Sequence, residues 1–315
     1  MPKQKTYDIA IIGAGIVGLA GAIYAARMNL KVIVFGDERG GTLAKTHVVE
    51  NYPGFISLTG IELTERILEH VKSYDVEIVM KSVEKIDGKD GCFKIFTKDK
   101  EFLSKTLLFA TGSKYKELGI QGEQEFKNKG VHYCAVCDGP LYKGKEIVVV
   151  GGGDSAVKEA LFLSELGKKV YIFARSTLKP EPINMERMKR NKKIKAYEGI
   201  QLKEIKGDKF VKEIILDKPV NGSNKLKVDA IFVEIGHLPL SQLAIKFGVK
   251  VNEKREIIIS REARTNIKGI YAAGDVGDLK FKQAITGVGE AVTAIYSIYD
   301  DLKKGEIAVS STDEI

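Results

Sequence analysis

One strand–glycine–helix pattern occurs twice in this chain of 315 residues, with its first glycines, Gly13 and Gly151, 138 positions apart. In the first copy the apolar run Tyr7–Ile12 ends in GAGIVG, and a helix pattern then leads to a second apolar run, Val32–Phe35. The second copy, Lys145–Arg175, repeats this order around GGGDSA. Short, nearly all-apolar strands are typical of a parallel sheet that is buried on both faces. We therefore expect an α/β protein with two Rossmann-like dinucleotide-binding domains.

The glycines of such a loop have separate physical tasks. The first allows a tight turn, the second lets a pyrophosphate approach the backbone, and the third lets the helix pack closely on the sheet. The helix N-terminus adds positive potential. The loop residues expected to bind cofactors are Gly13, Gly15 and Gly18 in the first copy and Gly151, Gly153, Asp154, Ser155 and Ala156 in the second.

The order of the remaining segments indicates that the second domain is inserted into the first. Turn signals at Asp87–Gly88 and Asp90–Gly91 predict an antiparallel insert that returns to a buried strand at Lys105–Ala110. Near the C-terminus, the short strand in Gly269–Val276 and the helix pattern Ala284–Leu302 can complete the first sheet. Residues 1–115 and 242–315 would then form one discontinuous domain and residues 116–241 the other, both of the three-layer ββα type.

Two of the three cysteines lie close together in HYCAVCDGP, His132–Pro140. With His132, the pair Cys134 and Cys137 offers three zinc ligands, but no second Cys-x-x-Cys or His-x-x-x-His supplies a fourth. Cys92 stands alone in an alternating strand pattern, and we interpret it as a small buried apolar side chain. We assign no metal site, and zinc remains the less favoured alternative.

Redox chemistry suits this cysteine pair better than metal binding. Cysteines three residues apart can close a small disulfide ring, and a helix start favours the thiolate that must attack. Asp138 follows Cys137 directly and can exchange a proton with the leaving sulfur, although it can instead cap the next turn. Beside two dinucleotide domains, such a dithiol becomes one end of a relay from nicotinamide through flavin to a disulfide.

Several motifs together resemble the low-molecular-weight thioredoxin reductases, a branch of the FAD-dependent pyridine nucleotide-disulfide oxidoreductases. In the family's order they are GAGIVG, the triplet Gly40–Thr42, ENYPG at Glu50–Gly54, ATG, YCAVCDGP, GGGDSA, and GIYAAGDV followed by KQAI. They cover nearly the whole chain, and Cys-Ala-x-Cys-Asp-Gly is the most specific of them.

The resemblance implies that the first domain binds FAD. Beyond the loop glycines, the implied contacts are Asp37 or Glu38 for the adenosine ribose, Gly40, Gly41, Thr42 and Asn51 near the isoalloxazine, Asp275 for a ribityl hydroxyl, and Gln283 and Ala284 at the flavin end. Cys137 would accept electrons from the flavin, Cys134 would attack the disulfide of the partner, and Asp138 would act as the acid–base group. The implied activity is reduction of thioredoxin or a glutaredoxin-like protein by a homodimer.

The nicotinamide site departs from the family pattern. Family members that use NADPH usually carry His-Arg-Arg-x-x-x-Arg after the second dinucleotide motif, where the cluster grips the 2′-phosphate. This chain has ARSTLKPE at Ala174–Glu181, which leaves Arg175 and Lys179 to bind the nucleotide. Arg175 favours NADPH, and no acidic residue ends the strand to select NADH. The alternatives are another donor, such as NADH, ferredoxin or reduced flavin, or a redox-sensing flavoprotein without turnover.

Composition excludes several other classes of protein. Apolar residues make up 44% and charged residues 29% of the chain, which is typical of globular domains, and no apolar run is long enough to span a membrane. The N-terminal MPKQKTYD lacks the apolar core of a signal peptide, so we expect a cytoplasmic protein.

The net charge of +8 includes the basic segment Met185–Gly199, interpreted as a solvated helix face or as a docking surface for an acidic partner. No aromatic stacking pattern there indicates nucleic-acid binding.

Overall fold

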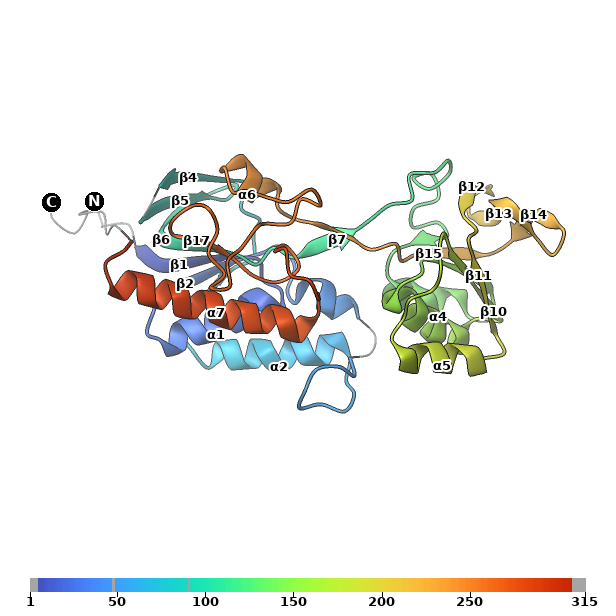
Figure 1. Cartoon of the computed structure of the whole chain (residues 1–315), viewed down its shortest axis with the longest axis horizontal. Coiled ribbons are helices and arrows are strands. Elements are labelled where there is room, and N and C mark those ends of the chain that lie inside the picture. The colour runs from blue at the N-terminus through green and yellow to red at the C-terminus, as the bar shows by residue number, and fades with distance from the viewer. Residues whose placement is uncertain (1–4, 47–48, 90, 308–315) are drawn as a thin grey trace. The chain divides into compact units, whose positions relative to one another are not determined.

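The chain is divided into two compact units (Figure 1) in a computed structural model that describes residues 5–46, 49–89 and 91–307. Unit 1 comprises Met1–Lys114 and Leu238–Ile315, and unit 2 is Tyr115–His237. The chain therefore leaves unit 1, builds unit 2 and returns. The boundaries placed from the sequence fall one residue later at the first crossing and four residues later at the second.

Unit 1 is built on a seven-stranded sheet in the order β3-β2-β1-β6-β5-β4, with β17 also paired to β6. The strands are β1 (Thr6–Ile12), β2 (Val32–Phe35), β3 (Glu77–Val79), β4 (Lys85–Lys89), β5 (Cys92–Phe96), β6 (Glu101–Phe109) and β17 (Ile270–Ala272). β5 pairs antiparallel with the first part of β6, whereas β17 pairs parallel with the last part, Leu107–Phe109. The strand β6 is thus shared by a parallel layer and an antiparallel hairpin.

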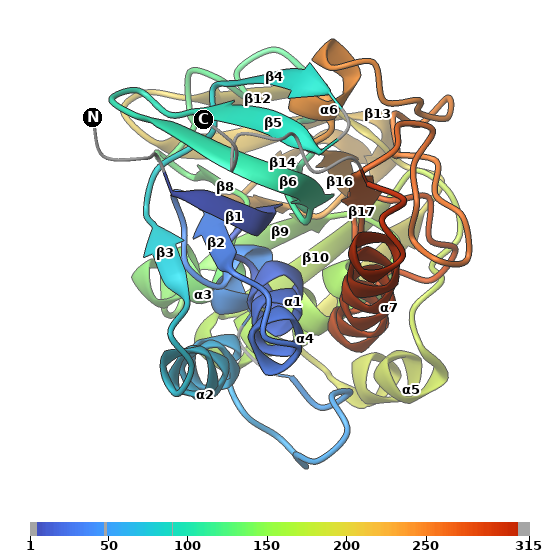
Figure 2. The same cartoon turned by 90° about the vertical axis from the view of Figure 1, so that its left-hand side faces the viewer.

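Three helices cover one face of the parallel strands of this sheet, and the β4–β5 hairpin folds over their other face (Figure 2). They are α1 (Ile16–Arg27), α2 (Gly60–Lys72) and α7 (Ala284–Lys303). On β1, Ile9 and Ile11 pack in the same core cluster as Ile295 of α7, whereas Ala10 and Ile12 pack with Phe93 of β5. Burial on both faces explains why this strand is apolar at almost every position.

Unit 2 repeats this layered plan. Its parallel five-stranded sheet has the order β11-β10-β9-β15-β8, formed by β8 (Val131–His132), β9 (Glu146–Val150), β10 (Lys169–Ala174), β11 (Ile194–Glu198) and β15 (Ala230–Val233). One face packs on α4 (Asp154–Leu166) and α5 (Pro182–Arg190), and the other on the antiparallel sheet of β12 (Leu202–Gly207), β13 (Val211–Val220) and β14 (Ser223–Lys227). On β9, Ile147 and Val149 point to the helices, whereas Val148 and Val150 point to β12–β14. The prediction of an α/β protein with parallel sheets is confirmed.

The two segments that cross between the units pair with each other. β7 (Ser113–Tyr115) and β16 (His237–Pro239) form a two-stranded sheet. On either side of it, the N–H of Leu240 donates to the carbonyl of Gly112, and the N–H of Lys116 donates to that of Gly236, both at 2.9 Å. Both glycines have positive φ, +66° and +96°, which other residues rarely adopt.

Some local predictions differ from the structure. Asp87–Gly88 is not a turn but lies inside β4, where Gly88 pairs with Phe93, and Asp90 lies outside the described residues. Cys92 is partly exposed at the start of β5, so its interpretation as a buried apolar side chain is wrong. The strand predicted at Lys105–Ala110 begins earlier, at Glu101, because its first half pairs with the hairpin.

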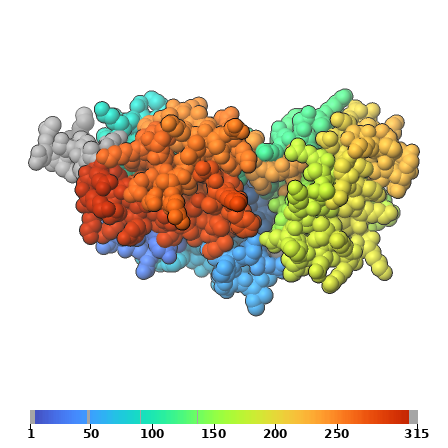
Figure 3. Space-filling view, viewed as in Figure 1, coloured from blue at the N-terminus to red at the C-terminus, as the bar shows by residue number. Residues whose placement is uncertain are grey.

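The basic segment Met185–Gly199 is not one helix face. It covers the end of α5, a turn and β11, and belongs to the yellow-green surface of unit 2 in Figure 3. An open cavity of about 510 Å³ lies there, lined by Ser164, Glu165, Arg187, Arg190, Asn191, Lys192 and Lys193. Within the described ranges, no helix has both the length and the apolar character that a membrane crossing requires.

Candidate active site

The first glycine-rich loop joins β1 to α1 in unit 1. A Cβ atom at Gly13 would overlap the carbonyl oxygen of Ala110, and one at Gly18 would overlap that of Gly13, so the packing itself requires both glycines. At Gly15, in contrast, the nearest atom to an added Cβ is 3.9 Å away. Gly15 is also the N-cap of α1 and offers its first turn no side-chain hydrogen bond. This space in front of unoccupied helix N–H groups fits a pyrophosphate.

A short 3-10 turn, Gly41–Lys45, lies beside this loop. The N–H of Gly40 donates to the carbonyl of Ala14 at 2.9 Å, and both Gly40 and Gly41 have positive φ, +78° and +57°. The hydroxyl of Thr42 donates to the carbonyl of Ser113 at 3.4 Å. The predicted triplet is therefore held against the loop by backbone contacts, and its hydroxyl group lies at the start of β7.

The two carboxylates after β2 are exposed and already have protein partners. Asp37 accepts a hydrogen bond from Ser82 at 2.7 Å, whereas Glu38 pairs with Lys45 at 2.8 Å. Both lie where a ribose hydroxyl would need an acceptor, at the carboxyl end of the second strand.

Residues from three distant segments of unit 1 come together near the start of α7. The side-chain amide of Asn51 donates to Oε1 of Gln283 at 3.0 Å, and Gln283 is the N-cap of α7, directly before Ala284. The carboxylate of Asp275 accepts from the hydroxyl of Ser113 at 3.2 Å. The resemblance assigns Gln283 and Ala284 to the flavin end, Asn51 to the isoalloxazine and Asp275 to a ribityl hydroxyl, whereas Ser113 was not predicted.

The second glycine-rich loop joins β9 to α4 in unit 2. A Cβ at Gly151 would overlap the carbonyl oxygen of Glu234, but one at Gly153 would meet no atom within 4 Å. Gly153 is the N-cap of α4, again without a side-chain cap. The backbone N–H of Lys179 donates to the carbonyl of Gly152 at 2.7 Å, which places Lys179 beside the loop. Arg175 follows β10 and is exposed.

A carboxylate occupies the first turn of α4. Oδ1 of Asp154 accepts from the N–H of Glu181 and from the amide of Asn184, both at 2.8 Å, and Lys158 lies 3.3 Å from Oδ2. Burial acts to raise the pKa of Asp154, but these hydrogen bonds and the lysine charge outweigh it and hold the pKa below its usual value. Asp154 therefore adds a negative charge next to Ser155, at the helix end where a dinucleotide would place its own.

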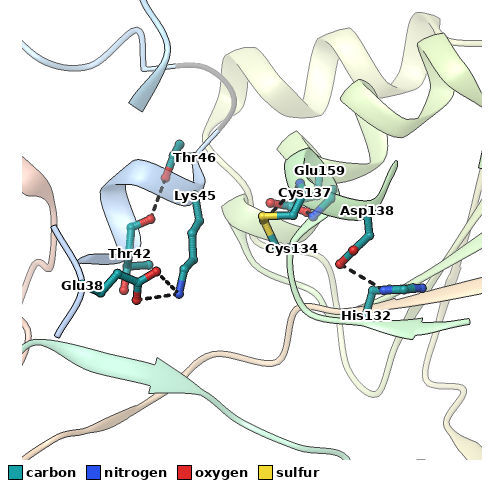
Figure 4. The surroundings of a disulfide bond; sticks show 10 residues. Glu38, Thr42, Lys45, Thr46, His132, Cys134, Cys137, Asp138 and Glu159 are labelled. Carbon is teal, nitrogen blue, oxygen red and sulfur yellow. Dashed lines mark hydrogen bonds and ion pairs between the residues drawn. A yellow bond between two sulfur atoms is a disulfide. The ribbon is translucent and has the colours of Figure 1, made fainter. Parts of the chain in front are cut away.

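Cys134 and Cys137 are joined by a disulfide (Figure 4). Their Cα atoms are 5.4 Å apart, and Cys134 is the N-cap of the short helix α3 (Ala135–Asp138). The sulfur of Cys134 accepts from the N–H of Cys137 at 3.2 Å. Cys134 is 8% exposed, whereas Cys137 is exposed. Cys137 is thus the exposed residue of the pair in this oxidised state, and Cys134 is held at the start of the helix.

Asp138 does not cap the turn that follows it, because its side chain is directed to His132 (Figure 4). Oδ2 of Asp138 lies 3.0 Å from Nδ1 of His132, and Nε2 of His132 lies 2.8 Å from the hydroxyl of Tyr142. His132 is 2% exposed and stacks on Phe232, with ring centroids 5.4 Å apart. Burial lowers the pKa of His132, and the neighbouring Asp138 only partly offsets this effect. The sequence had offered His132 only as a zinc ligand.

Two carboxyl groups near α3, the partly buried Glu159 and the buried Glu234, were not identified from the sequence. Glu159 of α4 accepts the N–H of Ala135 at 2.9 Å, and Glu234 follows β15 with an Oε1 atom that has no hydrogen-bond partner. Burial raises the pKa of Glu159 to about 7; burial and the charge of Glu159 raise that of Glu234 to about 9. The signal in the sequence was an acidic residue directly after the buried strand AIFV.

Among the described residues, no group of three or more His, Cys, Asp and Glu side chains is arranged to hold a metal ion. The sulfur atoms of Cys134 and Cys137, which a zinc site would need as ligands, are bonded to each other in the disulfide.

A chain with two dinucleotide-type loops and a Cys-x-x-Cys disulfide in its second unit has the features of a nucleotide-dependent disulfide oxidoreductase. The model of the family described as pyridine nucleotide-disulphide oxidoreductase matches residues 7–293, and this chain belongs to that family. Within the family, it is 38% identical over 306 residues to the thioredoxin reductase of Bacillus subtilis (strain 168), with 95% of each chain covered. The family is flavin-dependent, and it includes thioredoxin reductases that use FAD and NADPH.

The chain is also similar to solved structures of thioredoxin reductases. The crystal structure of Lactococcus lactis thioredoxin reductase aligns with a TM-score of 0.91 and 35% identity, over 95% of this chain and 99% of that one. A ferredoxin-flavin thioredoxin reductase from Clostridium acetobutylicum aligns with a TM-score of 0.51 and 34% identity, over 95% of this chain and 99% of that one. The sequence resemblance to low-molecular-weight thioredoxin reductases is confirmed.

Proposed function

We propose that the protein is a thioredoxin-disulfide reductase in which FAD passes electrons from NADPH to the Cys134–Cys137 disulfide. The observation that carries this proposal is the disulfide at the start of α3, next to Asp138 and within a dinucleotide-type unit. Bound FAD supplies the chemistry that a protein side chain lacks, since flavin can take a hydride and release its electrons to a disulfide.

Unit 1 is the proposed FAD-binding domain, and unit 2 the NAD(P)-binding domain that carries the redox-active pair. The open space at Gly15 supports pyrophosphate binding at the start of α1. The cluster around Gln283 supports contacts with the flavin end, because amide groups can both donate to and accept from the polar edge of a flavin.

Each cysteine has a separate proposed role. Cys137 takes the electrons, which breaks the S–S bond, and Cys134 then attacks the disulfide of thioredoxin to form a mixed disulfide that Cys137 resolves. Asp138 moves protons to and from these sulfurs. Cys134 is nearly buried in the disulfide form, so its attack requires that reduction, or the approach of the partner, uncover its sulfur.

The donor is proposed to be NADPH, bound by the second loop with Arg175 and Lys179. The acidic groups at this site support an alternative, which is an electron donor other than NADPH. The carboxylate of Glu198 accepts the N–H of Leu178 at 2.7 Å, between the two cationic residues, and Asp154 stands at the start of α4. Carboxylates in these places repel a 2′-phosphate, which disfavours NADPH relative to NADH, and a pyrophosphate, which disfavours both nucleotides relative to reduced flavin or ferredoxin. The alternative is therefore the same disulfide reductase driven by NADH, reduced flavin or ferredoxin, and the clostridial relative is named a ferredoxin-flavin thioredoxin reductase.

Anaerobic mixing of FAD-loaded protein with NADPH, and separately with NADH, tests the donor. We expect NADPH to bleach the oxidised flavin and to drive turnover with thioredoxin or a glutaredoxin-like protein. If both nucleotides fail but dithionite-reduced protein still reduces thioredoxin, the alternative donor is correct. If no donor, dithionite included, supports thioredoxin reduction, the protein is a redox sensor and the proposed function is wrong.

The matched variants Cys134→Ser and Cys137→Ser test the assignment of the two sulfurs. Both should lose thioredoxin turnover, by a factor of about 10³ or more, while NADPH still reduces the flavin. Only Cys137→Ser, which leaves Cys134 free, should still form a mixed disulfide with a thioredoxin. A mixed disulfide formed by Cys134→Ser instead would reverse the two roles.

A homodimer formed through unit 1 is proposed from the family resemblance, and the cytoplasmic location stays a prediction from the sequence. Light scattering on the FAD-loaded protein tests the first, since a mass of one chain at micromolar concentration would contradict it.

A further inference from the structure

Three side chains of unit 2 form a continuous polar chain that starts at the proposed acid–base group. Asp138 of α3, His132 of β8 and Tyr142 of the 3-10 turn Gly139–Tyr142 are linked by the 3.0 Å and 2.8 Å contacts at the two nitrogens of the imidazole. Figure 4 shows the first of these contacts. Each of the two ring nitrogens therefore faces one oxygen.

The surroundings fix how His132 carries its proton. The ring is 2% exposed and packs against Phe232 and Tyr142, with centroid distances of 5.4 and 5.3 Å. Burial lowers the pKa of His132, so the imidazole is neutral at pH 7 and has a single N–H. Next to a carboxylate that N–H belongs on Nδ1, which leaves Nε2 to accept the hydroxyl proton of Tyr142. The Tyr142 hydroxyl then donates to Nε2, and the Nδ1 proton lies beside the Asp138 carboxylate, at 3.0 Å but outside hydrogen-bond geometry in this structure.

Both ends of this chain of contacts reach the solvent. Asp138 and Tyr142 are each partly exposed, whereas the histidine between them is closed off. The charged groups that face the three residues are few: Asp138 acts on both His132 and Tyr142, and Asp229, at the start of β15, acts on Tyr142. Among the described residues, Asp138 is the charged group that acts to keep a proton on His132, and burial outweighs it.

We propose that His132 and Tyr142 form a proton relay that returns protons to Asp138 during reduction of the disulfide. The proposal rests on the role given to Asp138 above. Two electrons break the S–S bond. As the sulfur leaves, the Nδ1 proton of His132 passes through the carboxylate of Asp138 to that sulfur, the Tyr142 hydroxyl proton moves to Nε2, and Tyr142 takes a proton from solvent. One disulfide, two electrons and two protons thus give two thiols, with the second proton arriving directly from solvent. When the dithiol is reoxidised, a thiol proton that returns by the reverse path restores the Nδ1 proton of His132.

A kinetic experiment separates a relay from a purely structural contact. His132→Asn keeps an N–H donor where Nδ1 was but has no second nitrogen to accept from Tyr142, and Tyr142→Phe keeps the ring but removes the hydroxyl. With FAD-loaded protein and thioredoxin, both variants should lower kcat about tenfold and move the pH profile, while flavin bleaching by the donor stays unchanged. Tyr171→Phe is the control, because its hydroxyl donates to Glu146 at 3.0 Å, outside the relay.

The outcomes distinguish this proposal from the proposed function. If Asp138→Asn is impaired but His132→Asn and Tyr142→Phe keep the kcat and pH profile of the parent protein, the relay is wrong and the reductase stands. If Asp138→Asn is fully active, the role of Asp138 in the proposed function is wrong, and the relay with it.

A second measurement needs no turnover. In ¹⁵N NMR spectra of histidine-labelled protein, comparison with His132→Asn identifies the His132 signals among those of the four histidines. We expect a neutral ring protonated on Nδ1 at pH 7. A ring that is cationic, or protonated on Nε2, would overturn the relay even if no donor drives the enzyme, because Tyr142 could then not donate to it.

Discussion

The two glycine-rich loops have the same local geometry but different electrostatics. In both, the first glycine is required by packing and the second leaves open space at a helix N-cap. The first turn of α1 contains no acidic residue, whereas the first turn of α4 contains Asp154, fixed by three partners. The third position also differs, since Gly18 has no space for a side chain and Ala156 carries one.

This difference separates two requirements that the glycine pattern combines. Backbone geometry makes a phosphate-sized space, and both loops have it. Affinity depends on the charges around that space, where the first loop favours an anion and the second opposes it. We therefore expect tight FAD binding in unit 1 and weak nucleotide binding in unit 2, as suits a cofactor that stays and a donor that must leave.

The largest expected effect is on stability, and it concerns the third glycine-motif positions of the two loops, Gly18 and Ala156. Gly18→Ala places a Cβ on the carbonyl oxygen of Gly13, which should cost about 3 kcal/mol or more in stability and prevent FAD binding. Ala156→Gly, the converse change, should cost only about 0.5–1 kcal/mol. Urea unfolding of both variants measures this; equal losses would mean that the two helices pack alike on their loops.

Next in size is the effect of filling the two open spaces. Gly15→Ala should fold but lose FAD, whereas Gly153→Ala should keep FAD and bind the nucleotide at least tenfold more weakly, about 1.4 kcal/mol. Flavin absorbance and nucleotide titration separate the two. Loss of FAD by Gly153→Ala would contradict the assignment of cofactors to units.

A smaller effect is expected from the coupled carboxyl groups beside the second loop, the partly buried Glu159 and the buried Glu234. A raised pKa means that the folded protein binds the proton more tightly than the unfolded chain, so stability is present at low pH and is lost as the pH rises from about 5 towards 9. Glu234→Gln should remove much of this loss, and raise the melting temperature by a few degrees at pH 9 but not at pH 5. A parallel shift at both pH values would mean that Glu234 is already ionised in the folded protein.

The smallest expected effect comes from the charge at the start of α4. Asp154→Asn should strengthen nucleotide binding by up to about fivefold, since a charge at a helix end contributes about 0.3–1 kcal/mol. Asp208→Asn, the same change of charge in the turn between β12 and β13, is the control. Weaker binding by Asp154→Asn would show that the link from Asp154 to α5 matters more than its charge.

The sequence predicted those parts of the molecule that local patterns control. β2 has the predicted limits Val32–Phe35, and α7 begins at Ala284 as expected, because an apolar strand between turns and a long amphipathic helix are visible within one window of sequence. The turn predicted at Asp87–Gly88 failed, because pairing of Gly88 with Phe93 continues the strand through it. That pairing is a tertiary constraint that overrides the local preference of both residues.

What only the tertiary structure decided is which side chains surround the disulfide. The residue pattern alone supplied Cys134, Cys137 and Asp138 and the family to which they belong. The contact of His132 with Phe232, and the burial of Glu234, arise because β8 pairs with β15, a strand about one hundred residues later in the chain. Burial and charge around a group depend on neighbours that are distant in sequence, so its protonation could be read only after the sheet had assembled.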